Sequence, residues 1–271
     1  MLRNPDEALD KLVNDVLSST KYNGVCADLV RGIGSQELTK RRTTKEALKA
    51  TKNKLHQVGG AYLDGRENYT AWLSELVAVA HNDNRTELQR FCREIMAHHA
   101  STRERLPILE QFYSIILADI APIQSVLDIA CGLNPMAIPW LPLAEDATYY
   151  GCDIFAPLVD FLNQFLQHMH VRGHIQTCDV IQACPTQEVD VAFVLKAIPC
   201  LEQIDKHAGY HLLRAINARY LIVSFPVHSL GGRSKGMAAY YTAHFRELVD
   251  DAAWDVRTFA FATELVFVVR K

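Results

Sequence analysis

Residues 125–135 read SVLDIACGLNP, a short apolar run that passes through Asp128 into a turn containing Gly132 and Pro135. Four more runs rich in β-forming residues follow at 149–154, 174–178, 189–195 and 220–225. Amphipathic stretches typical of helices occur at 107–118, 156–170 and 207–217. This alternation of strand and helix patterns predicts a parallel sheet covered by helices, which places this part of the chain in the α/β class.

The C-terminal end of the chain breaks this alternation. Residues 256–262 and 264–269 both read as strands, and only Thr263 separates them. A parallel connection needs a crossover of a dozen or more residues, so these two runs can pair only in the antiparallel direction. We therefore expect an antiparallel pair at the edge of the sheet.

The first 105 residues show a different pattern. Apolar residues recur at helical spacing in the segments 6–17, 43–55, 72–80 and 87–96. No strand-like alternation occurs in this part of the sequence. We predict an all-helical domain at 1–105, followed by the α/β domain at 106–271.

Charge is distributed unevenly between these two parts. Residues 1–105 carry a net charge of +3 and residues 106–271 a net charge of −6. Seven lysine and arginine residues lie within 40–54, and Lys45, Lys49 and Lys52 fall on one face of a predicted helix. Such a concentration predicts contact with a polyanion. The alternative is a solvated helix face that happens to be basic.

The composition limits the class of protein further. The 271 residues are 49% hydrophobic and 22% charged, which excludes a disordered chain, a collagen-like fibre and a small disulfide scaffold. Seven cysteines without a regular spacing indicate free thiols in a reducing compartment. No apolar run approaches the ~18 residues that a membrane-spanning helix requires, and charged residues interrupt the N-terminal segment. We expect a cytoplasmic monomer without membrane contact.

Acidic residues accompany three of the predicted strands. Asp128 lies in the first, Asp153 follows 25 residues later in the second, and Asp179 follows the third. Because parallel strands end at one edge of a sheet, these side chains would meet there. An acid at this distance from a glycine-bearing turn suits the two hydroxyls of a ribose. A second acid, one strand later, can accept a hydrogen bond from an exocyclic amine.

The turn itself argues against a dinucleotide ligand. Pyrophosphate binding requires the pattern G-x-G-x-x-G, whereas residues 130–135 have Gly132 alone and Pro135. A nucleoside without phosphates fits this turn better, and the antiparallel edge pair matches the methyltransferase version of the sheet. The pattern therefore predicts a class I (Rossmann-like) methyltransferase that uses S-adenosylmethionine. The alternative is that these acids only end strands and cap helices.

Several longer motifs occur in order along the chain. They are KLH at 54–56, GGAY at 59–62, HHASTRERL at 98–106, LDIACGLNP at 127–135, GCDI at 151–154, LK at 195–196, SFP at 224–226 and SLGGRSKGM at 229–237. These motifs are spread over nearly the whole chain. In them the sequence strongly resembles the aminoglycoside-resistance 16S ribosomal RNA (guanine-1405, nitrogen 7) methyltransferases. The resemblance implies methyl transfer from S-adenosylmethionine to nitrogen 7 of guanine 1405 in the 30S subunit. It also implies resistance to 4,6-disubstituted 2-deoxystreptamine aminoglycosides of the kanamycin and gentamicin type.

The resemblance implies roles for single residues in binding the cofactor. Arg105 would bind the cofactor carboxylate, with Arg103 as the rival, because a guanidinium pairs well with a carboxylate. Ala130 and Gly132 would let the backbone pass close to the methionine moiety. The remaining cofactor contacts would come from Tyr62, Asp153, Ile154, Asp179 and Val180.

Other residues would face the RNA. Lys196, at the end of the fourth strand, would lie against the target guanine or its phosphate; the alternative is a lysine that points to water. The loop 229–237, with Arg233, Lys235 and Met237, resembles the segment that closes over the extruded base, and the basic helix face would bind phosphates. Nitrogen 7 of guanine already carries a free lone pair, so we expect neither a general base nor a metal site.

Other functions stay open at this point. One is a methyltransferase for a small molecule or a protein, which would not need the cations of 40–54, and another is a methyltransferase of a different ribosomal RNA site. A third is an RNA-binding protein that keeps the cofactor pocket without turnover. Comparing methyl transfer to isolated 30S subunits with transfer to free metabolites tests for a small-molecule enzyme. Single-turnover transfer tests for a protein that binds RNA without turnover.

Overall fold

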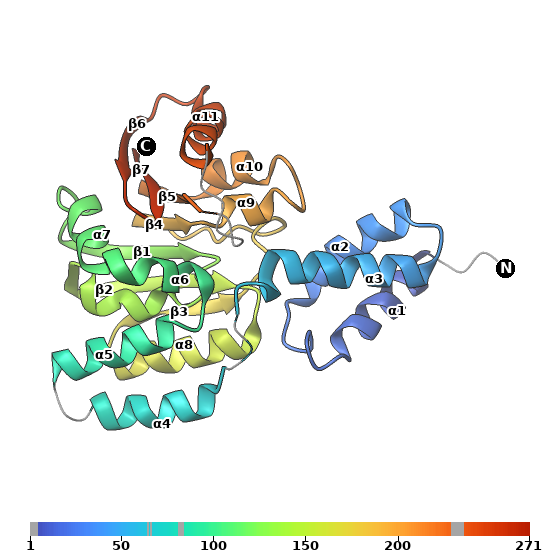
Figure 1. Ribbon diagram of the computed structural model, residues 1–271, viewed down its shortest axis with the longest axis horizontal. Helices are drawn as coiled ribbons and strands as arrows, with labels where there is room; N and C mark the ends of the chain where they lie inside the picture. Colours follow the sequence, from blue (N-terminus) through green and yellow to red (C-terminus); the bar gives the residue numbers. More distant parts are fainter. Residues whose placement is uncertain (1–4, 64, 66, 81–83, 229–235) are drawn as a thin grey trace.

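The computed structural model describes residues 5–63, 65, 67–80, 84–228 and 236–271. At its centre is a seven-stranded sheet in the order β3-β2-β1-β4-β5-β7-β6 (Figure 1). The strands are β1 (Ile123–Ile129), β2 (Leu143–Asp153), β3 (Arg172–Thr177), β4 (Val189–Leu195), β5 (Ala218–Pro226), β6 (Asp255–Ala260) and β7 (Glu264–Arg270). The pairs among β1 to β5 are parallel, and β7 is antiparallel to both β5 and β6. The predicted parallel sheet and its antiparallel edge pair are confirmed.

The largest difference between predicted and observed strands is at β2. This strand begins at Leu143, six residues before the predicted start, whereas the other strand ends agree within two residues. Glu145 and Asp146 are exposed, so the first half of β2 lacks an apolar signature. Leu143 nevertheless pairs with Ile123, across a register shift in β1. Pairing with a neighbour, rather than local sequence, therefore sets this boundary.

Helices cover both faces of the sheet. On one face, α7 (Leu109–Ile116) and α8 (Ala156–His168) bury Phe112 and Phe161. On the other face, α10 (Ala208–Ala215) and α11 (Met237–Val249) bury Leu213 and Phe245. Because both faces are covered, β4 is buried over almost its full length and β5 is buried continuously over residues 221–225, as is usual for central strands.

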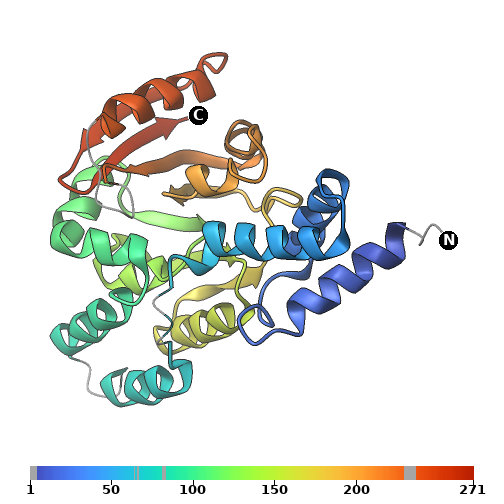
Figure 2. The ribbon, with the colours of Figure 1, turned by 45° about the vertical axis from the view of Figure 1, so that its right-hand side comes forward.

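The helices before residue 106 belong to two different cores. α1 (Pro5–Leu17), α2 (Ala27–Lys40) and α3 (Thr44–Leu55) enclose a core of their own. α4 (Tyr69–Ala80) and α5 (Arg85–Met96) instead bury Leu76 and Phe91 in the core of the sheet, with α4 beside α8. Figures 1 and 2 show α1–α3 standing to one side of the sheet and α4 running along α8. The described residues of 5–105 are helical or irregular apart from isolated bridges. The helices up to about residue 60 pack in their own core, and those after it pack in the core of the sheet, so the cores do not divide at residue 105.

Backbone contacts attach the α1–α3 unit to the end of β2. The Cys26 N–H donates to the Ile154 carbonyl over 2.8 Å, and Val25 forms an isolated bridge with Phe155. A π-helix, η1 (His56–Gly60), continues α3 toward the same place. The other short helices are α6 (Ala100–Arg105), η2 (Leu106–Ile108), η3 (Asn134–Trp140) and α9 (Ile198–Leu201). The first helices therefore meet the sheet at the carboxyl ends of its strands.

All seven cysteines fall within the described residues and are free thiols, as predicted. Within the described ranges, no helix combines the length and the apolar character needed to cross a membrane.

We expect Leu76→Ala, on α4, to lower the free energy of unfolding by about 2–5 kcal/mol, because this side chain is fully buried in the core of the sheet. Val77→Ala, on the same helix but 38% exposed, should change it by less than about 0.5 kcal/mol. Urea unfolding followed by circular dichroism measures both. Equal effects would mean that α4 does not belong to this core.

Candidate functional site

A cavity of about 800 Å³, including the open space at its mouth, lies at the carboxyl ends of β1, β2 and β4. The sheet side of its wall includes Ala130, Cys152, Asp153, Leu195 and Lys196. The helical side includes Leu29, Val58, Gly59, Tyr62 and Leu63. The wall is therefore built by both the sheet and the N-terminal helices.

Asp153 ends β2 and is held by three backbone N–H groups. Its Oδ2 accepts from Gly132 over 2.8 Å, and its Oδ1 accepts from Ile154 over 2.7 Å and from Phe155 over 3.2 Å. Burial raises the pKa of the Asp153 carboxyl, and these three hydrogen bonds oppose the rise. A carboxylate offers about four lone-pair positions, so acceptor capacity remains for a ligand in the cavity.

Asp179 follows β3 and stands on a second part of the wall. Its Oδ1 accepts from the Ile181 N–H over 3.0 Å, and its Oδ2 accepts from Gln182 Nε2 over 3.1 Å. Gln182 also donates to the Asp28 carbonyl of α2 over 3.0 Å. Burial raises the pKa of Asp179, and its two hydrogen bonds oppose the rise. One side chain thus joins the second acid to the N-terminal helices.

The turn after β1 has a strained backbone. Ala130 and Gly132 have φ values of +50° and +49°, in the left-handed region that L-residues rarely adopt. A Cβ on Gly132 would come within 2.9 Å of the His99 ring. Glycine at this position therefore lets the turn pass His99 and present its N–H to Asp153. Ala130 lines the cavity, whereas Gly132 is not among the lining residues.

The structure brings most of the sequence-predicted cofactor residues together. Those that line the cavity are Tyr62, Ala130, Asp153, Ile154, Asp179 and Val180. Lys196, predicted to face the target base, lines it as well. Arg105 and Gly132 do not.

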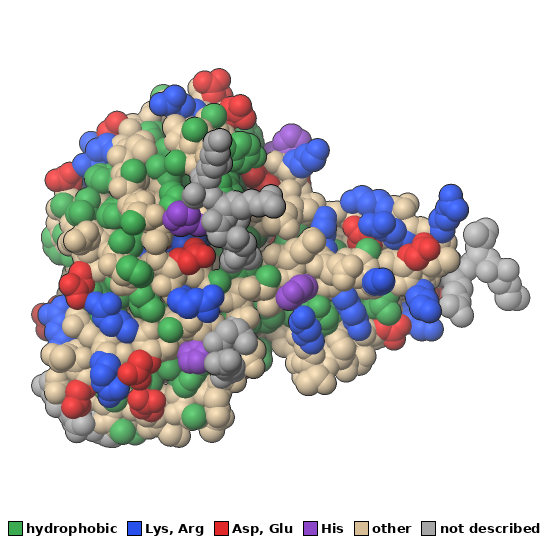
Figure 3. Space-filling model, in the orientation of Figure 1, with side chains coloured by type: hydrophobic (Ala, Val, Ile, Leu, Met, Phe, Trp, Pro, Cys, Tyr) green, Lys and Arg blue, Asp and Glu red, His purple; other side chains and the backbone are tan. Residues whose placement is uncertain are grey.

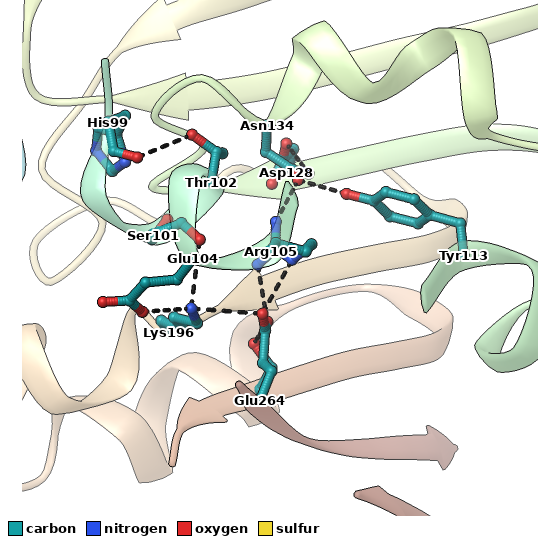
Figure 4. A network of polar contacts seen from close by, with 11 residues as sticks. His99, Ser101, Thr102, Glu104, Arg105, Tyr113, Asp128, Asn134, Lys196 and Glu264 are labelled. Carbon is teal, nitrogen blue, oxygen red and sulfur yellow. Dashed lines mark hydrogen bonds and ion pairs between the residues drawn. The ribbon is translucent and has the colours of Figure 1, made fainter. Parts of the chain in front are cut away.

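Arg105 lies in a buried network instead of at the cavity (Figure 4). Its guanidinium donates to both carboxylate oxygens of Glu264, over 2.7 and 3.0 Å, and to Asn134 Oδ1 over 2.8 Å. Neither side chain of the Arg105–Glu264 pair is exposed to solvent. The structure therefore does not bring Arg105 to the position predicted for it, because Glu264 already occupies its bidentate face. Arg103, the rival, is exposed and donates to the Ala97 carbonyl over 3.3 Å.

Lys196 joins this network to the cavity wall. Its φ is +59°, and its Nζ lies 2.8 Å from Glu104 Oε2, 3.3 Å from the Ser101 carbonyl and 3.5 Å from Glu264 Oε2. Burial disfavours ionisation of Glu264, but the charges of Arg105 and Lys196 outweigh it and hold the pKa of Glu264 below its usual range. Lys196 is 6% exposed and its ammonium group is paired, which corrects the alternative of a lysine that points to water.

His99 lines the cavity, and the sequence left open whether this residue contacts the cofactor or caps a helix end. Its ring lies parallel to the ring of Tyr62, with centroids 5.9 Å apart, and its Nδ1 is buried without a partner among the described residues. Burial, together with the positive charges of Arg105 and Lys196, lowers the pKa of His99 to about 4. The imidazole is therefore uncharged at neutral pH. The HHASTRER motif contains His99, but only the fold places its ring in the wall.

The cations of 40–54 lie on the surface of the α1–α3 unit (Figure 3). Lys45 and Lys49 are exposed on α3, and Lys52 is half-buried. A separate groove between α2 and α3 is lined by the cations Lys40, Arg41, Arg42, Lys49 and Lys54 and by the acids Glu37 and Glu46.

Of the predicted RNA-binding loop, Arg233 and Lys235 lie outside the described residues. Met237 is half-buried and begins α11.

A sheet of this order, with a cavity at its carboxyl edge, an acid at the end of β2 and another after β3, is that of a class I methyltransferase. Residues 18–268 match the family described as "Ribosomal RNA methyltransferase (FmrO)". The chain belongs to this family. The resemblance drawn from the sequence motifs is confirmed.

Individual relatives match over almost their whole length. The chain is 33% identical over 268 residues to a 16S rRNA (guanine(1405)-N(7))-methyltransferase of Micromonospora rosea, with 98% of each protein covered. It is 35% identical over 269 residues to the protein of that name from Frankia casuarinae, with 98% and 95% covered. Among solved structures, the methyltransferase RmtF in complex with S-adenosyl-L-homocysteine has a TM-score of 0.79 at 29% identity, with 100% of this chain and 99% of RmtF covered. The 16S rRNA methylase RmtB has a TM-score of 0.77 at 28% identity, with both chains fully covered.

S-Adenosylmethionine, the methyl donor of this class, fits the groups in the wall. Asp153 and Asp179 carry carboxylates that could accept hydrogen bonds from ribose hydroxyls and from the adenine amine. Leu29, Ile154 and Val180 give the wall apolar surface that would suit the adenine ring. The unpaired Nδ1 of His99 is a further polar atom without a partner among the described residues.

We expect Arg105→Met to destabilise the fold by about 3–5 kcal/mol, because it removes the bidentate partner of the buried Glu264 carboxylate. The control is Arg90→Met, which breaks an Arg90–Glu94 pair of similar length on the surface and should cost at most about 1 kcal/mol. Urea unfolding of both variants gives the comparison. Equal losses would show that burial adds nothing to the first pair.

Proposed function

We propose that this protein transfers the methyl group of S-adenosylmethionine to nitrogen 7 of guanine 1405 in 16S ribosomal RNA, with the assembled 30S subunit as substrate. The modification would confer resistance to aminoglycosides of the kanamycin and gentamicin type. The observation that carries this proposal is the match to relatives of that activity over 98% of the chain, which includes the α1–α3 unit as well as the sheet. We further propose that the enzyme acts in the cytoplasm as a monomer.

The chemistry requires positioning more than proton transfer. When bound, S-adenosylmethionine supplies an electrophilic methyl group on a sulfonium sulfur, and nitrogen 7 attacks it through an in-plane lone pair. Asp153 and Asp179 would fix the nucleoside, and the apolar wall would exclude water. The rate of methyl transfer would then come from aligning nitrogen 7 with the methyl group. His99, with its pKa of about 4, adds no positive charge that would repel the sulfonium. We propose that Lys196, held by Glu104 and Glu264, positions the target side of the cavity.

The target guanine lies within folded RNA, so the enzyme must expose it. Extrusion of a base costs a few kcal/mol, and phosphate contacts made by the basic α1–α3 unit would offset this cost. The product base carries a positive charge and a methyl group on the edge that an aminoglycoside would approach. Because an aminoglycoside is itself a polycation, both changes disfavour its binding.

The direct test is methylation of 30S subunits that lack the modification, with labelled S-adenosylmethionine. Borohydride and aniline treatment cleaves RNA at 7-methylguanine, and primer extension then locates the site. A single stop at guanine 1405, with gentamicin resistance in expressing cells, is the expected result. A stop elsewhere would indicate a different ribosomal site. Transfer to free metabolites but not to 30S subunits would indicate a small-molecule enzyme, and binding without transfer would indicate a non-catalytic RNA-binding protein.

Asp153→Asn should weaken S-adenosylmethionine binding by about 2 kcal/mol, roughly thirtyfold, because the ribose loses a charged acceptor. The side chain also orders the turn after β1, so the variant's thermal unfolding without ligand must be compared with that of the wild type. Asp160→Asn, at an exposed position on α8, is the matched control and should bind normally. Isothermal calorimetry gives the affinities, and unchanged binding by the Asp153 variant would refute its role.

Replacing Lys45, Lys49 and Lys52 together by Gln should leave S-adenosylmethionine affinity unchanged and weaken 30S binding. The slope of log affinity against log salt concentration should fall by about two to three units if each cation meets one phosphate. The matched control replaces three exposed cations at the edge of the sheet opposite the cavity, namely Arg172, Arg219 and Arg270. The same slope in both triple variants would mean that the α3 cations only face solvent.

A further inference from the structure

One aromatic ring on α11 is exposed to an unusual degree. Among the described residues, large hydrophobic side chains that stay exposed are Val77, Ile115 and Tyr240, and Tyr240 is the most exposed at 64%. It lies in the first turns of α11, on the helix that opens with Met237. Scattered exposed apolar residues are common, so exposure alone assigns no role to Tyr240. Its surroundings are more informative.

Other rings hold Tyr240 in place. Its ring is nearly parallel to that of His244, at 11° with centroids 6.0 Å apart, and meets the edge of Tyr241 at 5.2 Å. Tyr241 in turn stacks on Phe225 at 4.8 Å, and Phe225 is fully buried at the end of β5. We call Tyr240, Tyr241 and His244 the α11 ring cluster. The exposed ring is thus supported from behind and does not have to be ordered when a partner binds.

The α11 ring cluster is tied to the cofactor cavity. His244 Nε2 lies 2.8 and 3.0 Å from the two carboxylate oxygens of Glu202. Glu202 comes directly after α9, and α9 contributes Cys200 and Leu201 to the cavity wall. The pKa of Tyr241 agrees with this placement, since burial raises it and Tyr240, Cys200 and Glu202 raise it further. Figure 1 shows α11 over the α9–α10 side of the sheet.

We propose that Tyr240 is a stacking platform for a nucleobase of the ribosomal RNA that neighbours the target guanine. This inference rests on the RNA substrate of the proposed function and names a contact for it. Proteins that bind unpaired RNA stack its bases on exposed aromatic side chains, and every base has a face suited to this contact. Extruding the target guanine leaves its neighbours unstacked at the mouth of the cavity. Tyr240 is an exposed, supported ring that His244 and Glu202 connect to α9, which lines that cavity, and such a ring matches the chemistry of a base.

The test compares three variants of Tyr240 with a control elsewhere on the surface. Tyr240→Ala should weaken 30S binding roughly tenfold to a hundredfold, because one base–aromatic stack is lost. Tyr240→Phe keeps the ring and should stay within about twofold of the wild type, whereas Tyr240→Leu keeps apolar area without a π-face and should resemble Tyr240→Ala. Ile115→Ala, at a 45% exposed position on α7, should have no effect. S-Adenosylmethionine affinity, measured by calorimetry, should be unchanged in all four.

The readouts are 30S affinity by competition and single-turnover methylation at saturating enzyme. Wild-type affinity in Tyr240→Ala would overturn the proposal. Full affinity in Tyr240→Leu would also overturn it, since it would indicate apolar contact with a ribosomal protein instead of stacking on a base. Failure of the proposed function gives a different result from failure of the stacking proposal. Wild-type protein that binds 30S subunits without methylating them would contradict the activity. The affinities of the Tyr240 variants would still decide the stacking contact. Wild-type protein that does not bind 30S subunits at all would contradict both.

Discussion

The buried pair of Arg105 and Glu264 is the constraint on which the rest of the site depends. Glu264 begins β7, and its carboxylate also accepts a hydrogen bond from Ser224 of β5 and lies 3.5 Å from Lys196 at the end of β4. Arg105 ends α6 and reaches Asn134, which in turn donates to Asp128 of β1 over 2.9 Å. Because an unpaired charge in this environment is very costly, these elements must come together in one arrangement. The ends of β1, β4, β5 and β7 are thereby fixed next to the cavity.

A second set of contacts orients the two acids in the cavity wall. Asp153 is oriented by the N–H groups of the turn after β1 and of the residues that follow β2. Asp179 is oriented by Gln182, which also binds α2. Asp153 is therefore oriented by backbone groups alone, and Asp179 by one backbone group and one side chain. This is the preorganisation that a reaction driven by alignment needs.

The sequence predicted the features that depend on local pattern. Alternating strand and helix signals, a one-residue connection before β7 and acids after β2 and β3 are all short-range, and the structure bears them out. The partner of Arg105 lies 159 residues away, so no local pattern could show that Glu264 already satisfies this guanidinium. The same holds for His99, whose ring enters the cavity wall only through packing on Tyr62. Similarly, periodicity identified α4 as a helix but could not reveal that it packs in the core of the sheet.

The cavity wall is shared between two hydrophobic cores, since Leu29 belongs to the core of α1–α3 and Leu158 to that of the sheet. A small molecule bound there touches both cores at once. Its binding free energy would consequently also stabilise the contact between them, by an amount that rises with the logarithm of its concentration over its dissociation constant. A larger supply of that molecule would thus seat the first three helices more firmly on the rest of the chain.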